Sequence, residues 1–341
     1  MRSVPTGSDR IKMSSAKNIQ VSVVCYAYNQ AKYISKALDS ILAQKTTFEF
    51  EVIVHDDAST DNTSSILMEY AKQYNRIVPI IEQCNLYQHG GQINEVIAKY
   101  IRGKYVAYCE CDDWFIDENK LQLQYDYMIA HPDCSLCVHA VEMRSEDTKT
   151  PVGYLAPSHV EKDYSTDEII RGGGGLFGTN SMFFPSKYFL LPELFRGWGV
   201  GDYPECIYLS MNGSVHYLPF IGSVYRVCSE GSWTQRMGNP SFALKSNRQI
   251  IEALKHFNSK TGSMYVESVN EMVMHYRFEN AVLSRNIKEI LFGECRNTFY
   301  ELPVSQKMRA IVRCCTPLCF RRLLKEIKIV NGLLTRIKAP E

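Results

Sequence analysis

The residues best suited to chemistry in this chain form a short acidic run, Glu110-Cys111-Asp112-Asp113, which Trp114 follows. Three carboxylates within four positions repel one another unless something compensates their charge. A hard divalent cation, Mg²⁺ or Mn²⁺, binds carboxylate oxygens and would provide that compensation. The alternative is a solvated acidic turn, which is common in proteins. The run therefore points to a metal only if the neighbouring elements position it.

The segment before the run, Tyr105 to Cys109, is apolar and predicts a buried strand. Two earlier strand-like segments also end in polar residues. Gln20 to Tyr26 is followed by Tyr28-Asn29, and Phe50 to His55 is followed by Asp56-Asp57. In α/β sheets, ligands bind outside the carboxyl ends of parallel strands. We therefore expect the three polar groups at one edge of a sheet.

Helical patterns separate these strands. An i, i+3, i+4 repeat of apolar residues follows the first strand, and it predicts a helix with one buried face: Ile34, Ala37, Leu38, Ile41 and Leu42. A second helix is expected after Asp57, with Asp61 or Thr63 as its cap. Strand and helix alternate over the first 140 residues. This alternation predicts an α/β fold, with a mostly parallel sheet covered by helices on both faces.

The later segments are less regular. Strand-like patterns occur at 180–184 and 222–228, and a helix is expected at 94–101. Four consecutive glycines, 172–175, lack the Lys and the strand-to-helix context of a P-loop, so we interpret them as a flexible loop near a substrate. From Ser241 onward the pattern is helical.

Charge is distributed unevenly along the 341 residues, whose net charge is +1. From 305 to 341 there are nine Lys or Arg and two Glu. This end is either a solvated helical cap or a surface for anionic lipid, where each basic residue gains about 1 kcal/mol, and we favour the second. No apolar stretch reaches the length of a membrane span, and residues 1–20 lack a signal-peptide core, so we expect a cytoplasmic protein, peripheral to the membrane.

Several of the 12 cysteines lie in apolar, strand-like runs, among them Cys25, Cys109 and Cys137. A reduced thiol in such a position behaves as a small hydrophobic group. The spacings of the others lack the regular repeat of a zinc knuckle. We expect buried free thiols.

A nucleoside diphosphate needs a flat surface and a hydrogen-bond acceptor for its base, and a cation for its phosphates. Tyr28 could stack on the base, and Asp57 could accept a hydrogen bond from a base N–H. Asp112 or Asp113 could hold a metal that neutralises charge on a departing diphosphate. Taken singly, Tyr28 could equally be a core aromatic and Asp57 a helix cap.

Four blocks in this order resemble family 2 glycosyltransferases of the GT-A fold: VSVVCYAYNQ, ALDSILAQ, EVIVHDDASTDNT and GKYVAYCECDDWF. The resemblance runs from Val21 to Arg236 and is strongest up to His139. Gly201-Asp202-Tyr203-Pro204 and the SVYR segment at 223–226 look like the bacterial subgroup that serves capsule, exopolysaccharide or lipopolysaccharide assembly.

The resemblance implies a GT-A catalytic domain at 20–236, with a nucleotide-sugar half at 20–141 and an acceptor half at 142–236. Residues 1–19 are then a flexible N-terminus, and 237–341 a helical C-terminal region with a basic amphipathic end. The implied activity moves a sugar from a nucleotide-diphosphate donor, with UDP as the expected nucleotide, to a saccharide acceptor that is lipid-linked.

The resemblance also implies the site residues. Asp202 is the general base of an inverting displacement. Asp112 and Asp113 hold Mn²⁺ or Mg²⁺. Trp114, Asn180 and Trp233 are acceptor-side candidates. The nucleotide-sugar is expected to contact Tyr26, Ala27, Tyr28, Asn29, Asp57, Glu110, Asp112 and Asp113.

Two positions depart from the family pattern. Tyr26-Ala27 stands where Pro-Thr is frequent, and Val227-Cys228 stands where many relatives carry a His able to complete the metal shell. A thiolate is a soft ligand, poorly matched to Mg²⁺ or Mn²⁺. We therefore expect few protein ligands and weak metal binding without nucleotide.

Two rival functions remain open. A sugar nucleotidyltransferase would carry a Gly-rich, basic loop after the first strand, and Tyr26 to Lys32 is not one. A non-catalytic glycan-binding protein could keep the fold, although the set of candidate carboxylates disfavours it. Nucleic-acid binding is disfavoured because basic residues concentrate only at the C-terminal end.

Overall fold

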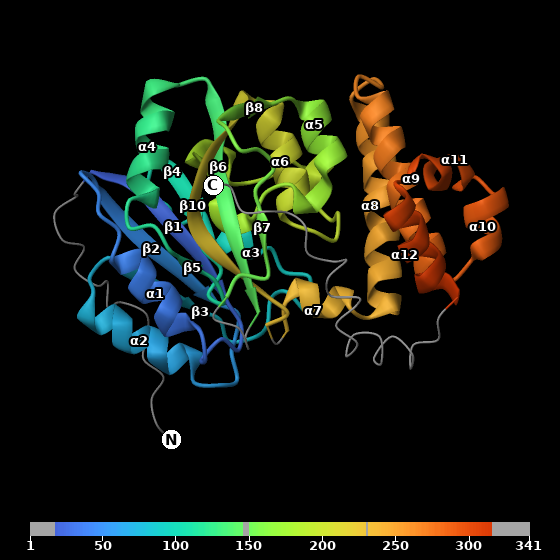
Figure 1. Cartoon of the computed structure of the whole chain (residues 1–341). Coiled ribbons are helices and arrows are strands. Elements are labelled where there is room, and N and C mark those ends of the chain that lie inside the picture. Colours follow the sequence, from blue (N-terminus) through green and yellow to red (C-terminus); the bar gives the residue numbers. More distant parts are fainter. Residues whose placement is uncertain (1–17, 146–149, 230, 316–341) are drawn as a thin grey trace.

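The structure is a computed structural model that describes residues 18–145, 150–229 and 231–315. Figure 1 shows a twisted central sheet with helices on both sides and a group of C-terminal helices on one flank. The strands are β1 (Ile19–Ala27), β2 (Glu49–Asp56), β3 (Ile77–Ile81), β4 (Tyr105–Tyr108), β5 (Trp114–Phe115), β6 (Cys134–Ser145), β7 (Gly153–Leu155), β8 (Lys162–Tyr164), β9 (Phe183–Pro185) and β10 (Ser214–Val227).

Helices α1 to α6 alternate with these strands, and helices α7 to α12 follow β10. They are α1 (Ile34–Leu42), α2 (Thr63–Gln73), α3 (Ile93–Ile97), α4 (Lys120–Ala130), α5 (Thr166–Gly172), α6 (Asp202–Ser210), α7 (Trp233–Met237), α8 (Pro240–Lys260), α9 (Val266–Leu283), α10 (Ile287–Phe292), α11 (Arg296–Glu301) and α12 (Val304–Cys315).

The strands form one sheet in the order β3-β2-β1-β4-β9-β6-β10-β5, with β7 paired to β6 and β8 to β10. β1 is parallel to β2 and β4, β2 is parallel to β3, and β6 is parallel to β10. β9 is antiparallel to both β4 and β6. The prediction of a mostly parallel α/β sheet is confirmed, and β9 joins its two parallel parts.

Helices cover both faces because successive strand residues point to opposite sides. Val23 and Val24 of β1 are both fully buried, and they belong to different apolar layers. The layer of Val24 includes Ile207 of α6, whereas the layer of Val23 includes Ile34 of α1. α1, α2 and α4 therefore lie on one face, and α5 and α6 lie on the other (Figure 1).

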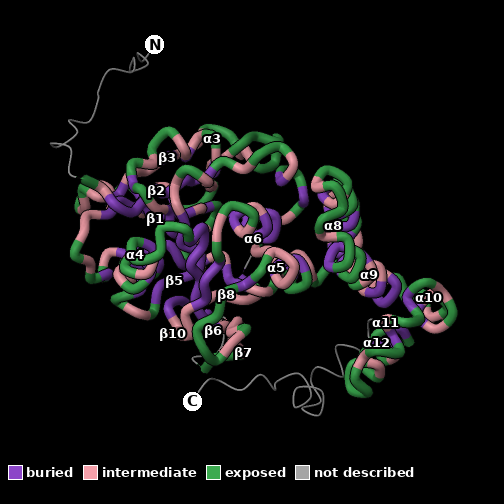
Figure 2. Tube along the Cα trace, turned by 90° about the horizontal axis from the view of Figure 1, so that it is seen from above, coloured by how far each residue is buried: buried purple, intermediate pink, exposed green. Residues whose placement is uncertain are grey.

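The C-terminal helices pack first on the α5 side of the sheet and then on one another. Ile250 of α8 and Met272 of α9 join the layer of α5 and α6, and Arg171 of α5 pairs with Glu271 of α9. Phe299 of α11 belongs to a third apolar cluster, formed with α9, α10 and α12. Figure 2 shows these helices extending away from the sheet. Among the described helices, none combines the length and the apolarity that a membrane span requires.

Most of the predicted elements are present, and four differ. The strand expected at 222–228 is the end of a longer strand, β10, which begins at Ser214. The segment 180–184 is not one strand, because Thr179–Ser181 forms a 3₁₀ turn and β9 begins at Phe183. α3 is shorter than expected and ends at Ile97. The four glycines are not an open loop, since α5 runs to Gly172 and a 3₁₀ turn continues to Gly175.

One smaller prediction is corrected and another is confirmed. The N-cap of α2 is Asn62, which forms no side-chain cap bond, and the Asp61 carboxylate before it accepts the amide of Thr63 at 2.9 Å. Every cysteine in the described ranges is a free thiol, and most are buried. The apolar and basic pattern after residue 315 lies outside the described residues.

Candidate active site

Three loops meet where β1, β2 and β4 end. The amide of Asp57 donates to the Ala27 carbonyl at 3.0 Å, and the amide of Cys111 donates to the Tyr26 carbonyl at 3.1 Å. These bonds continue the parallel ladders of β1 with β2 and of β1 with β4 beyond the strands. The Tyr28 segment, Asp57 and the acidic run therefore lie at one edge of the sheet.

The loop after β1 is fixed by Asn29, whose φ of 54° lies in the left-handed region that Asn tolerates. Its side-chain oxygen accepts the amide of Thr60 at 2.8 Å, and its own amide donates to Ser59 Oγ at 2.8 Å. Asn29 thus ties this loop to the loop after β2. Tyr28 beside it is 40% exposed, which leaves its ring accessible to a base.

The residues Tyr26 and Ala27, which replace the more frequent Pro-Thr, point to the interior. Ala27 is buried, and Tyr26 is half-buried with its hydroxyl donating to Asn94 Oδ1 at 2.9 Å. The Tyr26 ring lies 6.0 Å from the ring of Tyr108. Tyr26 therefore links the end of β1 to α3.

Asp57 is buried and faces a loop that the sequence did not indicate. Its Oδ1 accepts the amide of Leu86 at 2.6 Å, and its Oδ2 accepts the amide of Tyr87 at 3.0 Å. A carboxylate has about four acceptor positions, so two remain for a ligand N–H. Backbone donors carry no sequence signature, so no sequence pattern predicts the contact of Asp57 with residues 85–87.

Glu110 is a carboxylate with a strongly raised pKa at this edge. Burial, followed by the charges of Asp112 and Asp202, raises its pKa to about 8. Because charge acts over short distances in a protein, this places Asp202 near the acidic run, although 89 or more residues separate them. The Asp112 carboxylate accepts Ser229 Oγ at 2.6 Å, and burial raises its pKa as well.

Asp113 has a different environment from Asp112. It is 1% exposed, and its two oxygens accept the amide of Arg226 and the side-chain amide of Asn180, both at 2.8 Å. Asn180 is fully buried and also binds Val224 O and Ser223 Oγ. These contacts give Asp113 and Asn180 a structural role, and their roles as a metal ligand and an acceptor contact stay predictions.

The two tryptophan candidates lie on different elements. Trp114 is buried at the start of β5, against α1, with the Arg226 guanidinium 4.8 Å from its ring centroid. Trp233 is half-buried at the start of α7 and packs edge-on against Phe242 at 5.4 Å. Only Trp233 is accessible enough to meet an acceptor.

Next to Trp233, α7 brings Arg236 to the loop that covers Asp57. The Arg236 guanidinium lies 5.7 Å from the ring centroids of both Tyr87 and Trp233, and it donates to the Tyr87 hydroxyl at 3.4 Å. The loop that binds Asp57 is therefore held by a residue 149 positions after Tyr87. No local sequence pattern predicts this contact.

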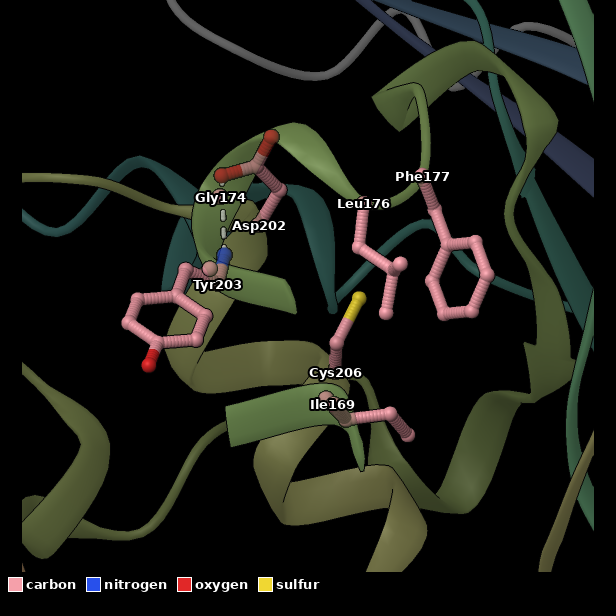
Figure 3. A pocket seen from close by; sticks show the side chains of 8 residues that line it. Ile169, Gly174, Leu176, Phe177, Asp202, Tyr203 and Cys206 are labelled. Carbon is pink, nitrogen blue, oxygen red and sulfur yellow. Dashed lines mark hydrogen bonds between the residues drawn. The ribbon is translucent and has the colours of Figure 1, made fainter. Parts of the chain in front are cut away.

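Asp202 is the first residue of α6. Its Oδ1 accepts the amide of Tyr203 at 2.8 Å and its Oδ2 accepts Thr179 Oγ1 at 3.1 Å, while burial raises its pKa. A cavity of about 10 Å³, the size of one water molecule, lies beside it. Figure 3 shows Leu176 and Cys206 on the apolar side of this cavity.

Glu205, one turn after Asp202, is a buried acid that the sequence did not single out. It accepts the Tyr108 hydroxyl at 2.8 Å, and burial together with the charge of Asp202 raises its pKa to about 8. The sequence does not show that a Glu on a helix is buried, because its partner on the strand is distant in the sequence. Acidic residues therefore extend from this edge of the sheet into the core.

The described side chains offer few ligands to a metal ion. Within the described ranges, no three His, Cys, Asp or Glu side chains lie close enough together to hold an ion by themselves. Asp112 has oxygen lone pairs left beyond its bond to Ser229. Cys228 is exposed, with a φ of 60°. These residues fit a divalent ion bound by Asp112 and completed by ligand phosphates and water.

Comparison with known proteins adds a family and a fold. The family model described as Glycosyl transferase family 2 matches residues 22–189. An uncharacterized protein of Mycobacterium tuberculosis is 35% identical over 266 residues, which cover 77% of this chain and 71% of that protein. A poly(ribitol-phosphate) beta-glucosyltransferase of Bacillus spizizenii is 34% identical over 105 residues, 30% of this chain and 16% of its own.

Among solved structures, S. aureus TarS residues 1–349 in complex with UDP has a TM-score of 0.52 at 16% identity. The similarity covers 87% of this chain and 80% of that one. At this identity the likeness concerns the fold, including the C-terminal helices that follow the sheet.

Proposed function

The chain belongs to glycosyl transferase family 2 and is a glycosyltransferase, and we propose that it moves a sugar from a nucleoside-diphosphate donor to a saccharide acceptor with inversion at the anomeric carbon. UDP is the expected nucleotide. The observation that carries the proposal is the convergence of Glu110, Asp112 and Asp202, since burial, followed by the charges of the other two, raises the pKa of Glu110 to about 8.

The base of the donor is assigned to Tyr28 and Asp57. Tyr28 offers an exposed ring for stacking, and Asp57 is held by two backbone amides that fix the direction of its remaining lone pairs. Stacking on an aromatic ring is worth about 1–3 kcal/mol per base. A uracil N–H directed at Asp57 would add a charge-assisted hydrogen bond.

The diphosphate and its metal are assigned to Asp112, with Glu110 beside it for the ribose or the sugar. A bound Mg²⁺ or Mn²⁺ would neutralise charge on the departing diphosphate. Because no complete metal site exists among the described residues, donor and metal are expected to bind together. This matches the weak metal binding expected from Cys228.

Asp202 is the proposed general base. In the transfer, the acceptor hydroxyl loses its proton to Asp202 while its oxygen bonds to the anomeric carbon, and the diphosphate leaves from the opposite face. Burial raises the pKa of Asp202, which strengthens it as a base near neutral pH. The bonds from Thr179 and Tyr203 hold its carboxylate in one orientation.

The acceptor is proposed to be a lipid-linked saccharide of a bacterial surface polysaccharide, met at the anionic inner face of the membrane. The similarity to a poly(ribitol-phosphate) glucosyltransferase supports this setting. On α12, Val304 and Met308 lie four residues apart on one face, and both are exposed, as is Arg309. Such a face suits an interfacial helix.

The test is a donor screen that follows nucleoside diphosphate release with Mn²⁺, comparing the wild type with Asp202→Asn. Release that depends on both acceptor and Asp202 supports the assignment. Wild-type transfer by the variant would reject Asp202 as the base. Production of a nucleotide-sugar from a sugar phosphate would instead reveal a nucleotidyltransferase.

A further inference from the structure

Three cationic side chains surround the buried ring of Trp114. Lys36 Nζ lies 3.3 Å from the ring centroid, and the guanidinium groups of Arg226 and Arg144 lie 4.8 and 5.8 Å from it. They come from α1, β10 and β6, so residues up to 190 positions apart in the sequence converge on one ring. We call these three side chains the cation cluster.

The cation cluster has little negative charge of its own. Arg144 pairs with Glu142. Arg226 uses its Nε to donate to the Asp112 carbonyl at 2.9 Å, and its charge acts on the carboxyl groups of Asp112 and Asp113. Burial, then the charges of Arg226 and Arg144, lower the pKa of Lys36. Cations that crowd together in this way are stabilised by an anion.

The cluster is beside the proposed donor site without being part of its acidic edge. Arg226 contacts the acidic run through the Asp112 carbonyl, and its charge acts on the Asp112 carboxyl. Only cations, and no carboxylate of the run, act on Lys36. Lys36 is exposed and Arg144 is partly exposed, so both can reach a bound group.

We propose that Lys36, Arg144 and Arg226 form a subsite for a phosphate group carried by the acceptor, separate from the place of the donor diphosphate. This rests on the proposed function. Guanidinium groups bind phosphate through two parallel N–H bonds, and the ring of Trp114 holds them in position. The phosphate would offset the mutual repulsion of the three cations and place the acceptor beside the metal corner.

The subsite is tested with inorganic phosphate on the full-length protein, with Mg²⁺ and with or without saturating UDP. Binding is followed by tryptophan fluorescence, because Trp114 lies under the cluster, and sodium chloride at equal ionic strength corrects for screening. Lys36→Gln removes one charge from an exposed side chain. Lys36→Arg restores it. Lys187→Gln is the matched control, an exposed lysine that lies 4.7 Å from the ring centroid of Tyr188.

We expect the wild type to bind phosphate equally with and without UDP, and Lys36→Gln to weaken that binding about fivefold. Lys36→Arg and Lys187→Gln should bind as the wild type does. Unchanged phosphate binding in Lys36→Gln would overturn the subsite. So would loss of phosphate binding when UDP is added, since it would assign the cations to the donor diphosphate.

The same titrations separate this proposal from the proposed function. UDP binding is recorded in each sample. A wild type that binds phosphate through Lys36 but does not bind UDP would count against the proposed donor and leave the anion subsite standing. If the wild type binds UDP and phosphate binding does not depend on Lys36, the anion subsite is rejected and the proposed donor is retained.

Discussion

The backbone amide of Arg226 donates a 2.8 Å hydrogen bond to Asp113, joining the end of β10 to the acidic run 113 residues earlier. The side-chain amide of Asn180 donates a hydrogen bond to the other oxygen of the same carboxylate. Two adjacent aspartates that look equivalent in the sequence are therefore different: Asp113 holds three segments together, and Asp112 keeps acceptor positions for a ligand.

This difference predicts opposite phenotypes for two substitutions. Asp112→Asn should abolish metal-dependent donor binding and leave the thermal unfolding midpoint within a degree or two. Asp113→Ala should lower the free energy of unfolding by about 1–3 kcal/mol for each buried donor left unpaired. Urea unfolding and calorimetric titration of donor with Mn²⁺ measure the two effects. Equal stability losses in both variants would contradict the division.

Asp202→Asn should lower kcat about 10²- to 10⁴-fold, the usual contribution of a general base, with donor KM unchanged. The amide oxygen of the variant can still accept the Tyr203 amide, and its NH₂ group can donate to the Thr179 hydroxyl, so the fold of α6 is retained. Steady-state rates of nucleoside diphosphate release give both constants. A change confined to donor KM would show that Asp202 binds the donor and does not take the proton.

The sheet was predictable from the sequence because its first strands are runs of β-branched residues bounded by polar ones, and the segment Tyr105 to Cys109 agrees with β4 to within one residue. β9 was misplaced because Asn180 and Ser181 belong to a 3₁₀ turn that only its contacts with Asp113 and Gly178 explain. The length of β10 was missed because Pro219 interrupts the pattern where the pairing with β6 shifts register.

The candidate site, like the sheet, was predictable only in part. Side chains that follow strands, such as Asp57 and Glu110, could be proposed from position alone. Their partners could not. The amides of Leu86 and Tyr87 bind Asp57 as backbone groups, and Glu205 acquires its perturbed pKa only from burial beside Asp202. Because the partners are far apart in the sequence, no local sequence pattern predicts such contacts.

Glu205 predicts a stability that falls as pH rises. Its pKa is raised from 4.5 to about 8 in the folded protein, so between these values the folded state holds a proton that the unfolded state has lost. Its contribution is complete below pH 4.5 and is lost as pH approaches 8. Glu205→Gln should remove this part of the pH dependence, as urea midpoints at pH 5, 6, 7 and 8 would record. Tyr108→Phe, which keeps the titrating acid, is the control and should retain a fall.

Lys120 predicts the opposite trend at higher pH. It is fully buried on α4, with Nζ donating to Gln124 at 2.9 Å and lying 4.2 Å from the centroid of the Phe115 ring, and burial lowers its pKa from 10.5 to about 7. Between these values the unfolded chain binds the proton that the folded protein lacks, so stability rises with pH, by up to about 1.4 kcal/mol per unit from this group. Lys120→Met keeps the volume and should flatten the rise seen in urea midpoints between pH 7 and 10, whereas Lys187→Met, at an exposed position, should leave it intact. An unaltered slope in Lys120→Met would mean that Lys120 is charged in the folded protein throughout this range.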